Sequence, residues 1–128
     1  MNFEDEKDYI MRIIKEAVSV MASVLLGKKY VSVEEQRQNH YEVSGKDLNG
    51  LLEMADRGKI NEAENALLGR LDYHNKQEVM AAVLFYQYLS EKNDTFLTQN
   101  NYSKEEVLDG LKQLMKKSGY EDLTDMLY

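Results

Sequence analysis

Two histidines are the side chains of this sequence best suited to acid–base or metal chemistry. His74 and Glu78 are four residues apart, so on one helix both could face the same metal ion. The HExxH spacing is absent, however, and no third ligand stands nearby, so we interpret His74 as a solvated residue at a helix start. His40 stands beside Tyr41 and Glu42, but the sequence specifies neither the oriented partner nor the pocket that a general base requires.

Other patterns that resemble catalytic motifs have structural explanations. The run Ala22–Lys29 nearly has P-loop spacing, but a helical pattern fills the loop and Lys29 replaces the hydroxyl residue that holds Mg²⁺. Paired carboxylates stand at expected helix starts, where the helix dipole favours negative charge. These pairs are Glu34–Glu35, Glu105–Glu106 and Glu121–Asp122. We therefore predict no catalytic residue, no bound metal and no cofactor, and favour a non-enzymatic protein.

Composition narrows the class of protein further. The 128 residues carry a net charge of −7 (16 basic against 23 acidic side chains), which argues against general nucleic-acid binding. Cysteine and proline are both absent, so disulfides are excluded and a reducing cytosol fits. The longest uncharged run, Ala17–Gly27, is too short for a membrane span of about 20 residues. The residues before it are too acidic for a secretory leader, so we expect a cytoplasmic protein that does not bind membranes.

The hydropathy pattern predicts a long first helix over about Glu4–Lys29. Acidic residues crowd its start and Lys28 and Lys29 its end, as the helix dipole favours. Its apolar stripe widens over the second half of the helix, so the helix is either central to the core or half of a homodimer interface. We favour the central position.

Residues 30–45 allow two interpretations. Ser32 and Glu35 have the spacing of a capping box, which predicts a short helix through Gln38. An alternation of apolar residues instead predicts a small hairpin or an irregular loop; its members are Val31, Val33, Tyr41 and Val43. We favour the helix.

Capping pairs place the helices that follow. They predict helix starts at Ser44/Asp47, Asn61/Glu64, Asn75/Glu78 and Ser103/Glu106. Gly58 separates the first two of these helices so closely that they should pack as an antiparallel hairpin. The polar stretch Lys92–Tyr102 is predicted to be a loop. The last long helix should end at Gly119 in a Schellman motif, with a helical turn or two over Glu121–Leu127.

The hairpin Leu48–Leu71 resembles a tetratricopeptide repeat (TPR). Gly58 and Ala63 stand at the places of the turn glycine and of the small residue that permits close packing, with large apolar residues Met54, Ile60 and Leu67 around them. Departures occur at Gly50, Leu51 and Arg70, and no proline closes the unit. The opening run 8–14 resembles uncharacterised helical proteins of Gram-positive bacteria, a resemblance that implies no function. We predict a single all-α domain over residues 1–128, with five to seven helices in antiparallel hairpins, as a TPR-like array or an irregular bundle.

The aromatic run Phe85–Tyr88 is the strongest surface candidate. Consecutive aromatic positions span more than one helix face, so either a ring points outward or the helix is surrounded by neighbours on several sides. Our leading hypothesis is a protein-interaction or adaptor module with an acidic, tyrosine-bearing surface for a protein or peptide partner, plausibly a basic one. Its candidate binding residues are Tyr86, Tyr88, Glu53 and Asp56. The alternatives are a small-ligand-binding protein or enzyme with His40 or His74 in an interhelical pocket, and a structural homo-oligomer joined through the first helix.

Overall fold

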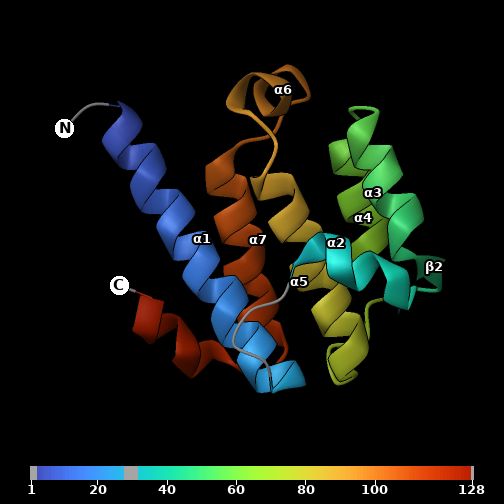
Figure 1. Cartoon of the computed structure of the whole chain (residues 1–128). Helices are drawn as coiled ribbons and strands as arrows, with labels where there is room; N and C mark the ends of the chain where they lie inside the picture. Colours follow the sequence, from blue (N-terminus) through green and yellow to red (C-terminus); the bar gives the residue numbers. More distant parts are fainter. Residues whose placement is uncertain (1–2, 28–31, 128) are drawn as a thin grey trace.

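Helices dominate the computed structural model, which describes residues 3–27 and 32–127 (Figure 1). In chain order the elements are α1 (Phe3–Leu26), α2 (Val33–Gln36), the 3-10 helix η1 (Arg37–Asn39), β1 (Glu42–Val43), β2 (Lys46–Asp47), α3 (Leu48–Asp56), α4 (Ile60–Leu68), α5 (Lys76–Ser90), α6 (Asp94–Gln99), α7 (Lys104–Lys117) and the 3-10 helix η2 (Glu121–Leu127). The all-α prediction is confirmed. The predicted lysine end of the first helix and Val31 of the alternating pattern lie outside the described residues.

Helix α5 is the centre of the packing. Ten of its residues are buried, and they lie on nearly every side of the helix. Helices α1 and α7 pack against α5 and against each other, while α3 contacts α5 from the other flank (Figure 1). The wide apolar surface of this helix is therefore explained by neighbours on several sides.

Helix α1 lies beside α5 rather than at the centre. Its apolar stripe packs on α5, α7 and η2, which accounts for the unusual width of the stripe. Tyr9 and Val24 on its outer side remain 45% and 38% exposed. The sequence prediction of a central first helix thus holds only for the inner half of α1.

Helices α3 and α4 form the predicted antiparallel hairpin (Figure 1). Gly58 adopts a φ of +85°, and a Cβ there would lie 2.4 Å from the side-chain oxygen of Asn100, so glycine is required twice over. The predicted cap Asn61 is wrong, because α4 begins earlier, after Lys59. The Asn61 amide instead donates to the backbone oxygens of Asn100 and Asn101 at 3.4 and 3.3 Å, which ties the hairpin to the α6–α7 connection.

Residues 32–47 contain the favoured short helix and, after it, a small hairpin in which Val33 takes no part, since it lies in α2. A short helix, α2 continued by η1, ends at Asn39, and a two-strand hairpin pairs Val43 with Lys46. Ser44 is not the predicted helix cap: Ser44 and Gly45 have φ values of +55° and +73° and form the hairpin turn. The cap of α3 is Asp47, whose carboxylate accepts from the backbone N–H of Asn49 at 3.0 Å.

The predicted loop Lys92–Tyr102 contains a short helix, α6. Asn93 caps it by accepting from the backbone N–H of Phe96 at 2.7 Å, and the side chain of Leu97 is fully buried. A side-chain cap and one buried anchor thus stabilise a helix of six residues that has no clear periodicity.

Both ends of α7 are as predicted. Ser103 accepts from the backbone N–H of Glu106 at 3.2 Å. At the other end Gly119 adopts a φ of +91°, and the N–H of Tyr120 donates to the carbonyl of Met115 at 2.7 Å, as in a Schellman motif. The chain then turns into η2, which packs against α7 and α1.

Close approach of α5 and α7 depends on Gly110. A Cβ at this position would lie 2.4 Å from Cε1 and 2.9 Å from the hydroxyl oxygen of the buried Tyr86. An ordinary Cβ contact lies beyond 3.4 Å, so the Tyr86 ring occupies the space that a side chain would need.

We expect Gly110→Ala to lower the free energy of unfolding by about 1–3 kcal/mol, because overpacking outweighs the gain in helix propensity of about 1 kcal/mol. Gly50→Ala is the matched control, since a Cβ at this α3 position meets nothing within 4 Å. It should be neutral or stabilising by about 0.5–1 kcal/mol. Urea unfolding of both variants measures the difference, and equal effects would refute the close-contact explanation.

Candidate functional site

Tyr86 lies in the core, so its assignment as a surface anchor is wrong. Its side chain is 1% exposed, and its hydroxyl donates to Glu64 Oε2 at 2.7 Å. The hydroxyl of Tyr102 donates to the same oxygen at 3.0 Å. Burial, together with the Glu64 charge, raises the pKa of both phenols well above the ordinary value. This network joins α4 to α5 and to the segment between α6 and α7, and its role is structural.

Tyr88 and Asp56, two of the four candidate residues, lie in contact. The half-buried Tyr88 donates its hydroxyl to both carboxylate oxygens of Asp56, at 2.8 and 3.0 Å. Lys92 forms an ion pair with the same carboxylate, and its Nζ lies 4.6 Å from the centre of the Tyr88 ring. We call these three residues the Asp56–Tyr88–Lys92 cluster. Arg37 of η1 also lies over the Tyr88 ring, with its guanidinium carbon 5.9 Å from the ring centre.

Electrostatics of the cluster favour the charged pair. Partial burial alone would raise the pKa of the Asp56 carboxyl, but hydrogen bonds from Lys92 and Tyr88 lower it below its ordinary value. Burial would depress the pKa of Lys92, yet its bond to Asp56 raises it. The Asp56 carboxylate and the Lys92 ammonium are thus already bound to each other, which leaves them little capacity to bind a partner.

Glu53 lies one helical turn before Asp56 on α3 and is exposed. Among the described residues, none donates a hydrogen bond to its carboxylate. Of the four candidate residues, therefore, two form one cluster, Glu53 stands free beside them, and Tyr86 belongs to the core.

A trough of about 410 Å³ runs between α1 and α5, and the sequence analysis missed it. Met11, Ile14 and Val18 of α1 form its apolar side, and they are faced by Gln87 and Ser90 of α5 and by Glu91, the C-cap residue of α5. Two further α1 residues, Lys15 and Ser19, complete the lining. One signal was present in the sequence: Gln87 and Ser90 are polar positions inside an otherwise apolar helix face.

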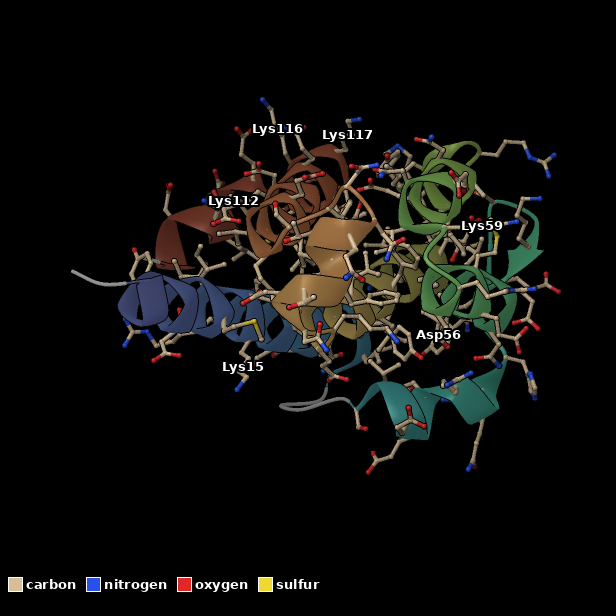
Figure 2. The ribbon with its side chains drawn as sticks, turned by 90° about the horizontal axis from the view of Figure 1, so that it is seen from above. Lys15, Asp56, Lys59, Lys112, Lys116 and Lys117 are labelled. Atoms are coloured by element: carbon tan, nitrogen blue, oxygen red, sulfur yellow. The ribbon has the colours of Figure 1, made fainter. Side chains whose placement is uncertain are left out.

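The trough opens on one side of the molecule. Figure 2 shows Lys15 projecting toward the side where α2 lies, whereas Lys112, Lys116 and Lys117 of α7 project on the opposite side. Glu91 stands at the trough near Glu34 of α2. Partial burial and the negative charge of Glu34 together raise the pKa of Glu91, against the opposing effect of Lys104, Lys15 and Lys92.

The two histidines do not meet. His40 adopts a φ of +50° and lines a polar cavity of about 770 Å³ with Glu42, Gln77 and Glu78 among its walls. His74 is exposed, and its backbone N–H donates to Asp72 at 2.9 Å. Glu78, four residues after His74, accepts from the backbone N–H of Ser44 at 3.0 Å, and the exposed His74 agrees with the interpretation as a solvated residue.

The described part of the chain shows neither a metal-ligand cluster nor a membrane-spanning helix. No three histidine or acidic side chains come together as metal ligands among residues 8–27 and 32–125, whose side chains the structure describes. No helix within residues 3–27 and 32–127 is both long enough and apolar enough to cross a bilayer.

Architecture and site define an all-α protein built around one surrounded helix, with an open trough along part of that helix. The chain matches the family of unknown function DUF6483 over residues 4–119, and therefore belongs to that family. No curated protein and no solved structure matches the chain significantly.

The ion pair of the cluster should make stability pH-dependent. A lowered carboxyl pKa contributes stability above the unfolded-state pKa, and this contribution is lost as the pH falls through the folded-state pKa. We expect Asp56→Asn to cost about 0.5–1 kcal/mol near pH 7, a small value because the pair is partly exposed, and to cost nothing in acid. Glu53→Gln is the control and should stay within about 0.5 kcal/mol of wild type at both pH values. Urea unfolding at the two pH values provides the measurement; an Asp56→Asn cost that persists in acid would contradict this assignment.

Proposed function

We propose that this protein is a non-enzymatic interaction module that binds a basic protein partner on the side that carries the trough. The observation that supports the proposal is the juxtaposition of Glu91 with Glu34 beside an apolar surface. Partial burial and, after it, the negative charge of Glu34 raise the pKa of Glu91 against the effect of nearby lysines, so a cationic group of a partner would stabilise the charged carboxylate further.

Two exposed acidic residues, Glu53 and Glu91, remain available to a basic partner. Glu53 and Glu91 make no side-chain hydrogen bond or ion pair with the described residues, in contrast to Asp56. The overall charge of −7 adds a long-range attraction for basic partners. In this proposal Tyr88 lies beside the contact surface and contributes ring area, while its hydroxyl stays bound to Asp56.

The proposal also includes the TPR-like character of the hairpin and a cytoplasmic location, both expected from the sequence. The TPR-like signature of the α3–α4 hairpin is of a kind that serves protein binding, and the absence of cysteine fits a cytoplasmic location.

A second candidate function rests on the His40 cavity. Its volume of about 770 Å³ and its polar walls would suit a small polar ligand, with His40 as the one ring nitrogen donor at its edge. Native mass spectrometry of protein purified from its own cells tests this candidate. A bound small molecule lost in His40→Ala would favour it over the interaction module, and a bare protein mass would count against it.

The main proposal is tested by affinity capture from the native cell extract at low and high salt. We expect a stoichiometric partner at low salt, weakened by salt, with its yield falling about fivefold or more in the double variant Glu53→Gln/Glu91→Gln. The matched control is Glu105→Gln/Glu121→Gln, which removes two charges on α7 and η2. These residues lie on the side of Lys112 and Lys116, since Glu105 shares their helix face and Glu121 lines a small pocket with them.

The control variant should capture the partner as wild type does. An equal loss in both variants would mean that only net charge matters, and capture of no partner at either salt would refute the proposal. Circular dichroism of both variants verifies that the helices are retained.

A further inference from the structure

We infer that the trough between α1 and α5 is the seat of an amphipathic helix supplied by the partner, with a basic residue directed at Glu91. The inference rests on the proposed function and names the chemistry of the partner. All the residues that line the trough come from α1 and α5, so no third element of the described chain closes it.

The same pair of helices already binds a helix on its other side. Helix α7 packs against both α1 and α5 with an apolar face that includes Leu111 and Met115. Its Lys112, Lys116 and Lys117 point away from the side toward which Lys15 projects (Figure 2). The α1–α5 pair therefore has two grooves, one filled by α7 and the other forming the trough. Ridge-into-groove packing favours a helix as the occupant of the trough as well.

Dimensions agree with such an occupant. From Met11 to Ser19, at a rise of about 1.5 Å per residue, the α1 wall measures about 12 Å, or two helical turns. The apolar residues Met11, Ile14 and Val18 recur at helical spacing along it; Ile14 and Val18 are only 1% and 5% exposed, so Met11 supplies most of the apolar surface that a partner helix could reach. Met11 at one end of the wall adds a flexible side chain that can adapt to the shape of the occupant.

Charge distinguishes the two walls. Lys15 lies on the α1 wall and Glu91 on the α5 wall, and neither side chain forms a hydrogen bond or an ion pair with the described residues. Near Glu91, Lys92 is held by Asp56, and Lys104 donates to the backbone oxygens of Ser90 and Lys92. A cation at the α5 wall therefore meets Glu91 and Glu34, whereas a cation at the α1 wall meets Lys15. The basic residues of the occupant must face α5, which also sets its orientation.

A small molecule fits this geometry less well. Pockets that bind small molecules enclose most of the ligand surface, whereas the trough is walled on two sides only and would leave one flank of a small ligand in water. A partner helix covers its own exposed flank with polar residues and needs no closure.

The test uses a defined probe, an 18-residue amphipathic peptide with a leucine face and a lysine face, titrated into the full chain. Two-dimensional amide NMR should show shift changes concentrated on α1 residues 11–19 and α5 residues 87–91. We expect a peptide with glutamates in place of the lysines to bind at least tenfold more weakly.

Two tryptophan variants provide the matched comparison. Ser19 lines the trough, and Ser23 lies one turn further along α1, exposed and outside the lining. Ser19→Trp should raise the dissociation constant of the lysine peptide at least tenfold, and Ser23→Trp should leave it within twofold. Glu91→Gln should weaken binding several-fold and reduce its salt dependence.

Several results would overturn the inference. They are equal effects of the two tryptophan variants, equal binding of the glutamate peptide, and shifts centred on the α7 lysines. The inference would also fail if a small amphiphile such as decanoate saturated the trough and the peptide could not displace it. The trough would then be a small-molecule site. If the peptide fails while partner capture still depends on Glu53 and Glu91, the inference falls and the proposed interaction module stands.

Discussion

The structure depends on burying α5 on nearly all sides. A helix with ten buried residues must be surrounded, and α1, α7 and the α3–α4 hairpin supply the surrounding surfaces. Tyr86 adds a specific condition, because its hydroxyl is buried and must find a hydrogen-bond partner on a neighbouring helix. A buried hydroxyl without a partner costs about 1–3 kcal/mol of stability. Glu64 of α4 accepts its hydrogen bond at 2.7 Å, and Gly110 of α7 leaves room for its ring. One side chain thus specifies how two of the neighbouring helices approach α5.

The same requirement explains where the open surface lies. Along most of α5 the positions that face neighbours are apolar, but Gln87, Ser90 and Glu91 near its C-terminal end are polar and line the trough with α1. Apolar side chains there would form a larger exposed patch, which soluble monomers seldom tolerate without a partner. Polar walls on one side and the apolar residues of α1 on the other make a surface that can stay hydrated alone and still receive a helix.

Local signals made the helices predictable, and long-range packing decided the rest. Asn75, Ser103 and Gly119 act through hydrogen bonds within a few residues, so their roles were correctly predicted from spacing. Ser44 failed because the same residue suits a helix cap and a hairpin turn, and its contacts with Leu67 and Arg70, distant in sequence, favour the turn. Tyr86 and Tyr88 are two residues apart and alike in type, yet about 160° apart around the helix, and only the placement of α4 and α7 shows which one is buried. The trough itself comes from two helices more than 60 residues apart, a relation that no single-helix pattern encodes.

The distinction between engaged and free polar groups determines which residues can recognise a partner. Asp56, Tyr88 and Lys92 satisfy one another, so a partner that bonded to them would first have to break existing interactions and would gain little net free energy. Their effect is to hold the C-terminal end of α5 against α3, while Arg37 over the Tyr88 ring fixes η1, and with it α2, beside α5. That arrangement keeps Glu34, which pairs with Arg37 at 3.9 Å, near Glu91 at the edge of the trough. The cluster chosen from sequence as a binding site is better understood as the support of one, and the recognition capacity lies in the residues that it positions.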